Sequence, residues 1–356
     1  MTSRRTHMDI FWQDKSVLIT GNTGFKGSWL SFWLLELGAH VHGFSLPSDS
    51  QPNLHDQLGL QSDMSSHYGD ICDADALSRW VSETQPDIVF HLAAQPLVRP
   101  SYQKPHQTWN TNVMGTLNLL QAVTRLEKPC SVVVITTDKV YENREWVHPY
   151  RETDRLGGHD PYSASKAAAE ILVSSWRQSF LAVRPELRVV TARAGNVIGG
   201  GDWAEDRFIP DVIRAWQAGT DFLLRNPQSK RPWQHVLEPL SGYLKLARML
   251  FEGNPLSDAY NFGPDPKDAV TTKALLKEVC QHWQGSWRLA GETNQPHEAG
   301  ILSLSSEQAC RHLNYVPRWH LDQAVKATIE WYRSVMLDGH AAKALTSEQI
   351  HQFGAP

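Results

Sequence analysis

The sequence has few cysteines, no long apolar run and no excess of charge of one sign. Its 356 residues include four cysteines, and none of them stands in a CxxC pair or beside a clustered histidine. We therefore expect neither a disulfide framework nor a metal site, and the free thiols favour a reducing, cytoplasmic location. The most apolar early segment, WLSFWLLELG, is far shorter than the roughly 20 residues that a membrane span needs.

The balance of charge excludes one class of partner. The chain has 34 Lys and Arg against 38 Asp and Glu, a formal net charge of −4. This composition provides no electrostatic attraction to nucleic acid. With 41% hydrophobic and 20% charged residues, the chain resembles an ordinary globular protein that can bury a sizeable core.

A glycine turn follows the first apolar segment. Ser16–Thr20 predicts a strand, the motif GNTGFKG occupies residues 21–27, and apolar residues then recur at helical spacing up to Leu37. Glycines permit a tight turn, and the helix N-terminus offers its N–H groups to a pyrophosphate. The spacing is GxxGxxG, not the standard GxGxxG, and an ordinary turn is the alternative. Because both flanks fit, we predict a dinucleotide site.

The end of the second predicted strand, residues 41–45, bears on which dinucleotide binds. The standard pattern places an acid there for the adenosine ribose, whereas this chain has Ser45, with Asp49 as the nearest carboxylate. No Lys or Arg stands nearby to meet the 2′-phosphate of NADP. The sequence therefore favours NAD.

Short apolar segments alternate with helical patterns through the first half. Further strands are expected at residues 67–70, 86–94, 131–135, 187–193 and 258–263, with a crossover helix at 110–125. This alternation predicts an α/β fold with a doubly wound, parallel, Rossmann-like sheet. Ligands bind such sheets beyond the carboxyl ends of the strands.

The composition changes after Asn196. A triple-glycine turn is followed by expected helices at residues 206–218, 273–281, 306–313 and 321–337 and by a polar tail. We predict a smaller, mixed C-terminal substrate domain. The NAD-binding domain would comprise residues 1–196 and 232–263, and the substrate-binding domain residues 197–231 and 264–356.

Two clusters of polar residues point to catalysis. Thr137, Asp138 and Lys139 follow the strand at residues 131–135, and Tyr162 and Lys166 stand four apart at the start of a helix. Side chains four apart share one face, and a nearby cation favours the phenolate of a tyrosine. Tyr162 would then accept a proton from an alcohol. The alternative is an ordinary helix start with an exposed Tyr and Lys.

These motifs together resemble the extended short-chain dehydrogenases/reductases. The resemblance rests on GxxGxxG, Asp70-Ile71, HLAAQ at residues 91–95, Asn110 before a helix, TTDKVY at 136–141 and YSASK at 162–166, and it covers about 200 residues. The Thr-Asp pair is similar to the nucleotide-sugar 4,6-dehydratases of that family, although Lys139 replaces their usual Glu. RAGNVIGGGDW, DRFIPD and RPWQHVLEPLSGYL resemble the CDP-glucose subgroup and extend the match to about residue 265.

The resemblance implies conversion of CDP-D-glucose to CDP-4-keto-6-deoxy-D-glucose and water with transient reduction of bound NAD. Tyr162 would deprotonate the 4-hydroxyl, Lys166 would lower the pKa of Tyr162 and hold the nicotinamide ribose, and Thr137 would bind the same hydroxyl. Asp138 would protonate the leaving 6-hydroxyl, and Lys139 would take the C5 proton, unless Lys139 is a surface lysine and another group or water is the base. The family also implies a homodimer or homotetramer and a role in deoxysugars of bacterial O-antigen lipopolysaccharide.

The resemblance also assigns binding residues. Those expected at NAD are Gly21, Thr23, Gly24, Phe25, Lys26, Gly27, Ser45, Asp70, Ile71, Leu92, Ala93, Ala94, Thr136, Tyr162 and Lys166. Those expected at the substrate are Gln95, Asn196, Arg207, Arg231 and His235. For the basic groups among them, a solvated surface is the alternative interpretation.

Two other functions share part of this pattern. A nucleotide-sugar 4-epimerase or reductase of the same fold would use Tyr162 and Lys166, but it has no use for an acid at Asp138. A catalytically silent NAD-binding redox sensor would need no intact Thr, Tyr and Lys set, and the sequence keeps that set.

Overall fold

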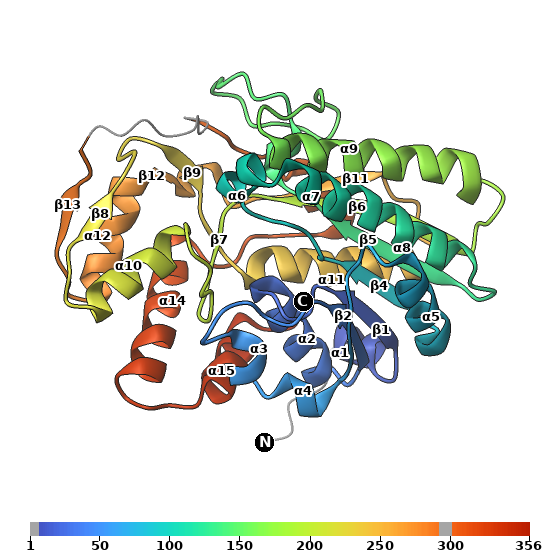
Figure 1. Cartoon of the computed structure of the whole chain (residues 1–356), viewed down its shortest axis with the longest axis horizontal. Helices are drawn as coiled ribbons and strands as arrows, with labels where there is room; N and C mark the ends of the chain where they lie inside the picture. Colours follow the sequence, from blue (N-terminus) through green and yellow to red (C-terminus); the bar gives the residue numbers. More distant parts are fainter. Residues whose placement is uncertain (1–6, 292–300) are drawn as a thin grey trace.

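A parallel seven-stranded sheet forms the centre of the computed structural model, which describes residues 7–291 and 301–356 (Figure 1). The strand order is β11-β6-β5-β4-β1-β2-β3, and every neighbouring pair is parallel. The strands are β1 (Ser16–Thr20), β2 (His40–Ser45), β3 (Ser65–Tyr68), β4 (Ile88–His91), β5 (Cys130–Ile135), β6 (Leu187–Ala194) and β11 (Ala259–Phe262). The doubly wound, Rossmann-like α/β fold expected from the sequence is confirmed.

Both faces of the sheet are covered by helices, because successive strand residues point to opposite faces. Leu18 and Val132 pack in the core with α5 (Ala74–Thr84), α8 (Gly115–Thr124) and α9 (Pro161–Trp176). Ile19 and Val133 pack in the other core, with α1 (His7–Trp12), α2 (Phe25–Glu36) and α11 (Leu237–Phe251). The strands therefore carry apolar residues on both faces, as parallel strands in α/β proteins do.

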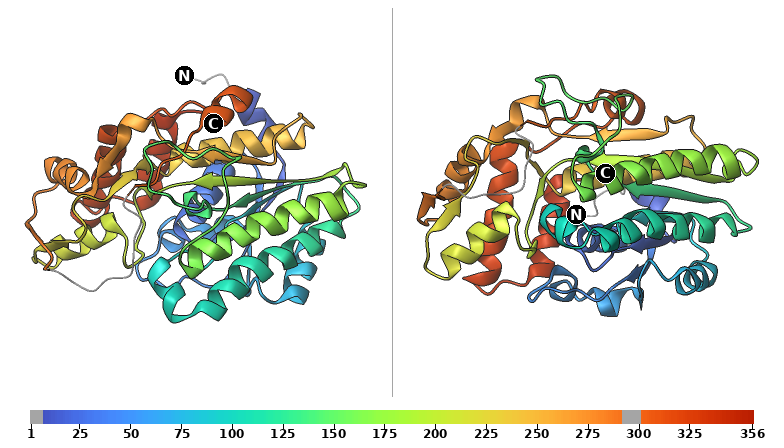
Figure 2. Two further views of the ribbon diagram at one scale, coloured as in Figure 1. Left: turned by 90° about the horizontal axis from the view of Figure 1, so that it is seen from above. Right: turned by 45° about the horizontal axis from the view of Figure 1, so that its top comes forward.

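A smaller group of elements lies beside the carboxyl edge of the sheet (Figures 1 and 2). It contains β7 (Val197–Ile198), α10 (Phe208–Gln217), β8 (Phe222–Leu224), β9 (Lys230–Pro232), β10 (Gln234–His235), β12 (Ala269–Thr271), α12 (Thr272–His282), β13 (Trp287–Leu289) and α14 (Leu321–Met336). These strands pair two by two, β10 with β7, β12 with β9 and β13 with β8. The division into two domains at the expected boundaries stays a prediction.

The remaining elements are short or peripheral. They are α3 (Leu54–Gln57), α4 (Leu60–Asp63), α6 (Val98–Gln103), α7 (Pro105–Trp109), α13 (Glu307–Leu313) and α15 (Ala342–Phe353), with single turns at Asn110–Met114, Asp138–Val140, Arg177–Leu181 and Pro266–Asp268. Within the described ranges, no helix is long and apolar enough to cross a membrane.

Several boundaries differ from the sequence prediction. The third strand is β3, Ser65–Tyr68, not residues 67–70, because its partner β2 ends at Ser45, which pairs with Tyr68. The fourth strand ends at His91 rather than at residue 94. The expected polar tail contains α15, which packs Ile350 and Phe353 into the core against α2 and α14.

The glycine turn between β1 and α2 is sterically tight. Gly21 has a φ of +77°, and a Cβ there would lie 2.7 Å from the backbone nitrogen of Ala93, which follows β4. A Cβ at Gly27 would lie 2.1 Å from the carbonyl oxygen of Gly21. The turn, the start of α2 and the end of β4 therefore touch through backbone atoms, which only glycine permits.

We expect Gly27→Ala to lower the free energy of unfolding by roughly 1–3 kcal/mol, because backbone cannot yield to the added methyl group as a side chain can. Urea denaturation without NAD measures this loss. Gly24→Ala is the matched control, since a Cβ at Gly24 would lie 3.4 Å from the same oxygen and its φ of −75° suits any residue. Equal stability of the two variants would contradict the steric argument.

Candidate active site

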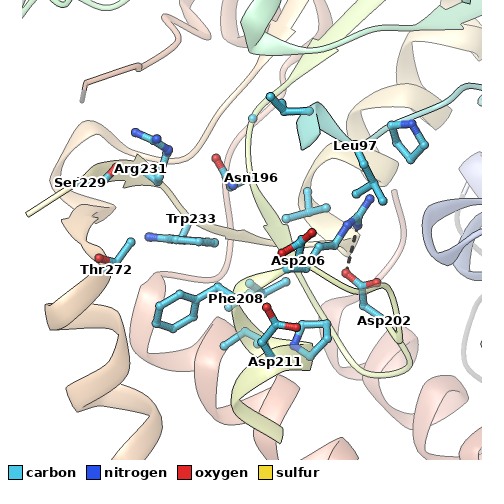
Figure 3. A pocket seen from close by; sticks show the side chains of 18 of the residues that line it. Leu97, Asn196, Asp202, Asp206, Phe208, Asp211, Ser229, Arg231, Trp233 and Thr272 are labelled. Atoms are coloured by element: carbon cyan, nitrogen blue, oxygen red, sulfur yellow. Dashed lines mark hydrogen bonds and ion pairs between the residues drawn. The ribbon is translucent and has the colours of Figure 1, made fainter. Parts of the chain in front are cut away.

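A cavity of about 320 Å³ lies between the carboxyl edge of the sheet and the smaller group of elements (Figure 3). Its lining includes residues from four sources: the turn after β5, the start of α9, the segment after β6, and α10 with β9. The predicted residues that it brings together are Lys26, Thr136, Thr137, Asp138, Lys139, Tyr162, Asn196, Arg207 and Arg231. The parallel sheet explains why these residues lie close together, because the carboxyl ends of its strands all lie at one edge.

The geometry beside this cavity fits a dinucleotide. Gly24 is the N-cap of α2 and has no side chain with which to cap it, so the first N–H groups of this helix receive no capping bond from that position. These groups suit the pyrophosphate of NAD. Thr23 and Ser45 lie 3.0 Å apart through their hydroxyl oxygens, and both donate to the carbonyl oxygen of Leu46.

The other expected cofactor residues follow the neighbouring strands. Leu92, Ala93 and Ala94 come directly after β4, and Ala93 packs against the Gly21 turn. Asp70 is exposed after β3, where its carboxylate accepts from the backbone N–H of Cys72, while the side chain of Ile71 is buried. This arrangement places all the strand ends that the sequence assigned to NAD on one edge of the sheet.

Tyr162 and Lys166 begin α9 and are both buried. The ammonium of Lys166 donates to the carbonyl oxygen of Ile135 at the end of β5, 3.1 Å away. Burial and the nearby Lys26 ammonium lower the pKa of Lys166 to about 8.

The expected acidification of the phenol is not met. Burial raises the pKa of Tyr162 to about 12, although a hydrogen bond with Thr137 and the charge of Arg207 act in the opposite direction. The sequence argument considered only the charge of Lys166, whereas desolvation of the phenolate is the larger effect.

Asp138 is a buried carboxyl with one unsatisfied oxygen. It is 3% exposed, and its Oδ1 accepts from the hydroxyl of Thr137 at 2.9 Å. Its Oδ2 has no hydrogen-bond partner among the described residues and packs over Gly195, where a Cβ would lie 2.9 Å away. Burial raises the pKa of Asp138, against the opposing charges of Lys139, Arg231 and Lys26. This carboxyl is therefore suited to hold a proton and to donate it.

Lys26 joins the cofactor turn to the cavity. It stands in the first turn of α2, yet its side chain lines the cavity. Burial and the charge of Arg207 lower the pKa of its ammonium to about 8, while Asp138 and Asp202 raise it. The sequence assigned Lys26 to NAD alone, and its helical position gave no sign that the amine reaches the other ligand space.

The substrate side of the cavity combines cations with aromatic rings. Arg207 donates to Asp202 at 3.0 Å, and Arg231 is 7% exposed beside Asn196 in the lining. Phe208 packs against Trp233 with ring centroids 5.7 Å apart, in the part of Figure 3 where Arg231 and Thr272 also lie. Asp202 and these two aromatic residues were not predicted as site residues, although all three lie within the motifs RAGNVIGGGDW, DRFIPD and RPWQHVLEPLSGYL.

Two expected substrate residues do not line the cavity. Gln95 uses its side chain within its own loop, donating to Thr108 at 2.9 Å and accepting from the N–H of Leu97 at 2.6 Å. His235 is fully buried between the rings of Trp29 and Trp319, and burial lowers its pKa to about 3. His235 therefore belongs to the packed core and not to the lining of the cavity.

Comparison with known proteins was made on the whole chain. The model of the GDP-mannose 4,6-dehydratase family matches residues 18–328. The chain is 47% identical over 331 residues to a CDP-glucose 4,6-dehydratase of Salmonella typhimurium, covering 91% of this chain and 92% of that protein. It is 26% identical over 352 residues to a dTDP-glucose 4,6-dehydratase of Shigella flexneri, covering 89% and 92%.

Solved structures share the fold. A dTDP-glucose 4,6-dehydratase from Bacillus anthracis in complex with NAD is 20% identical, with a TM-score of 0.75 and coverage of 90% of this chain and 97% of that one. A UDP-glucose 4-epimerase from Thermotoga maritima with UDP-glucose is 22% identical, with a TM-score of 0.75 and coverage of 90% and 99%. Because a dehydratase and an epimerase match equally well, the fold alone does not separate these two activities.

The buried carboxyl of Asp138 predicts a pH-dependent cost in stability. Its pKa in the folded protein is raised, so its ionisation disfavours folding; this penalty is absent at low pH and grows as pH rises through the folded pKa. Asp138→Asn should therefore raise the free energy of unfolding near neutral pH, and the gain should vanish toward pH ~4, where the free carboxyl is protonated. Urea midpoints across this range measure it, and a gain that does not vary with pH would refute it.

Proposed function

The chain belongs to the GDP-mannose 4,6-dehydratase family, and on this premise we propose that it converts CDP-D-glucose to CDP-4-keto-6-deoxy-D-glucose and water. It is an NAD-dependent hydro-lyase. The preference for CDP-glucose is supported by 47% identity to a CDP-glucose 4,6-dehydratase over 91% of the chain.

One observation favours dehydration over 4-epimerisation: Asp138 lies in the same cavity as Tyr162 with a raised pKa. An epimerase moves hydrogen at C4 and needs no acid for a leaving group. A dehydratase must protonate the departing 6-hydroxyl, and a buried carboxyl that holds its proton supplies this.

The first half of the proposed reaction oxidises C4. Tyr162 accepts the proton of the 4-hydroxyl, and Thr137 hydrogen-bonds the same oxygen. Bound NAD would supply the redox chemistry, which removes a hydride from C4 and returns it at C6. Lys166, whose ammonium donates to the carbonyl oxygen of Ile135, would hold the nicotinamide ribose when NAD is bound.

The second half eliminates water. The new 4-ketone acidifies the proton at C5, and Lys139 takes this proton while Asp138 gives its own to the 6-hydroxyl. The C5–H bond and the C6–O bond break, a C5–C6 double bond forms and water leaves. When C6 has received the hydride, Lys139 gives a proton back to C5, and the proton that Tyr162 took from the 4-hydroxyl replaces, through solvent, the one that Asp138 gave away. Lys139 lines the cavity next to Asp138, as this step requires. A lysine acts as a base only as the free amine.

The diphosphate and nucleoside occupy the other end of the cavity in this proposal. Arg207, Arg231 and Asn196 line it and would hold the phosphate oxygens. The division into an NAD-binding domain and a sugar-nucleotide domain at the boundaries given above belongs to the same proposal.

We further propose a cytoplasmic homodimer or homotetramer that serves deoxysugar synthesis for bacterial surface polysaccharide. All four cysteines are free, which fits a reducing compartment. Large apolar side chains are exposed on neighbouring helical segments, among them Trp109, Met114, Ile171 and Phe180, and the segments that carry them lie along one side of the molecule (Figure 2). Light scattering tests the assembly, and a monomer would refute it.

Incubation of the pure protein with CDP-glucose, dTDP-glucose and GDP-mannose tests the function. We expect a 4-keto-6-deoxy product from CDP-glucose in preference to the other two. Tyr162→Phe is the negative control, because it removes the base and keeps the ring, so NAD should still bind while C4 oxidation stops. Formation of a 4-epimer without loss of water would replace the proposal by its alternative, and preference for another nucleotide would change the substrate.

Asp138→Asn and Lys139→Met should separate the two halves of the reaction. An amide cannot donate the proton, so Asp138→Asn should slow elimination by about 10²–10⁴-fold and leave a 4-keto sugar that still carries its 6-hydroxyl. Lys139→Met should stop exchange of the C5 proton with deuterated solvent. Mass spectrometry measures both. If Asp138→Asn slows oxidation and elimination equally, Asp138 is not the acid. If the C5 proton still exchanges with solvent in Lys139→Met, Lys139 is not the base.

A further inference from the structure

A buried ion pair lies behind the catalytic groups. Glu170, on α9, and Arg193, on β6, are each 4% exposed. The guanidinium donates from Nε to Oε1 at 2.9 Å and from Nη2 to Oε2 at 2.8 Å, which is the bidentate geometry of a strong pair. Neither residue lines the cavity that holds Tyr162 and Asp138.

Glu170 also accepts hydrogen bonds from two threonines. The hydroxyl of Thr136 donates to its Oε1 at 2.5 Å, and the hydroxyl of Thr191 donates to its Oε2 at 2.7 Å. Burial opposes the charge of Glu170, but Arg193 and the two threonines hold its pKa below the usual value. The carboxylate thus fastens α9 to β6 and to the residue that follows β5.

Arg193 extends the contact in the other direction. Its Nη1 donates to the hydroxyl of Tyr141 at 2.8 Å, and this hydroxyl donates to Oδ1 of Asn261 on β11, also at 2.8 Å. Tyr141 directly follows the turn Asp138–Val140. The pair is therefore bonded to residues on both sides of Thr137 and Asp138.

The catalytic groups come from two segments that are far apart in the chain. One is the turn after β5, with Thr137 and Asp138, and the other is the start of α9, with Tyr162 and Lys166. Glu170 is one helical turn beyond Lys166, and Thr136 directly precedes Thr137. A shift of either segment along the sheet would have to break a bond to Glu170 or to Arg193.

We propose that the Glu170–Arg193 pair is the positioning element of the active site and sets the placement of the Thr137–Asp138 turn relative to the Tyr162–Lys166 helix. The proposal rests on the proposed function for its kinetic consequences. Stability alone does not explain the pair, because apolar residues of similar size often replace a buried ion pair with neutral or favourable effect. Glu170 has a second effect, since its charge raises the pKa of Lys166, which burial and Lys26 lower.

The main experiment uses two variants. Glu170→Gln removes the charge and leaves Arg193 buried without its anion, which endangers the fold. Glu170→Leu with Arg193→Met removes both charges and keeps an apolar interior. In each folded variant we expect kcat to fall about 10²-fold, the loss associated with a misplacement near 1 Å, while KM for CDP-glucose and the affinity for NAD change less than about threefold (~0.7 kcal/mol).

Tyr141→Phe separates the contribution of Arg193 from that of Glu170. It cuts the branch from Arg193 to the turn that carries Asp138 and leaves every bond of Glu170 in place. We expect elimination to slow more than C4 oxidation in this variant, whereas the Glu170 variants should lose both. Single-turnover measurement of cofactor absorbance and of released product separates the two rates. Equal loss of both steps in Tyr141→Phe would overturn the division.

The pH profile is a readout that a merely structural role does not move, and hydrogen exchange shows which segments the pair holds in place. Without the charge of Glu170 the pKa of Lys166 falls further, so the alkaline limb of the kcat profile should move to lower pH. Amide exchange should become faster in α9 and in residues 136–141 of the NAD-bound protein and stay unchanged in α12. Hydrogen exchange requires no turnover, so it tests the positioning role even if the wild type converts no nucleotide sugar. That lack of conversion would refute the proposed function but not the positioning role.

Glu238→Gln is the matched control. Glu238 is fully buried in α11 and accepts from the backbone N–H groups of Arg318 and Trp319, away from the catalytic segments. The same change from carboxylate to amide at this position should leave kcat, the alkaline limb of the kcat profile and the rate of amide exchange in α9 as in the wild type. If the Glu170 variants fold and match this control in all three measurements, the pair has no positioning role.

Discussion

The Glu170–Arg193 pair is the interaction on which the arrangement of the active site depends. Each charge loses its hydration at 4% exposure, and the cost for such an ion is several kcal/mol unless its partners compensate it. Here both carboxylate oxygens and the guanidinium have close partners: Thr136 directly after β5, Thr191 on β6, and Tyr141 directly after the turn Asp138–Val140. The need to satisfy these two charges therefore fixes how the helix and the strand ends meet.

Burial also shapes the charges inside the cavity. It pushes ionisable groups toward their neutral forms, which lowers the pKa of Lys26 and Lys166 to about 8 and raises that of Asp138. The lining nevertheless gathers several cations, while Asp202 is engaged with Arg207. Ion pairs join Arg99, Arg207 and Arg225 to Asp206, Asp202 and Asp211, but the lining still has more basic than acidic side chains, and this excess favours an anionic ligand such as a diphosphate. The electrostatics thus favour the class of substrate that the family comparison indicates.

Much of this could be predicted from the sequence because the signals are local. Apolar runs fix strands such as Ser16–Thr20, glycine spacing fixes the turn, and parallel topology alone brings Thr137, Tyr162 and Asn196 to one edge. What escaped prediction depends on partners distant in the chain. Tyr68 ends β3 because Ser45 ends β2, and α15 is a helix in the core despite its polar sequence. His235 fills a space between two tryptophans that no local pattern reveals.

The tyrosine shows why proximity of charges is not enough to assign a pKa. A cation near a phenol lowers its pKa, but the same burial that brings them together removes the water that stabilises the phenolate. In Tyr162 desolvation prevails and raises the pKa of the phenol to about 12. The identical effect helps Asp138, whose role requires a retained proton. Burial therefore favours the acid of the second step and opposes the base of the first, so ionisation of Tyr162 depends on the cations around it, of which Arg207 already acts in that direction.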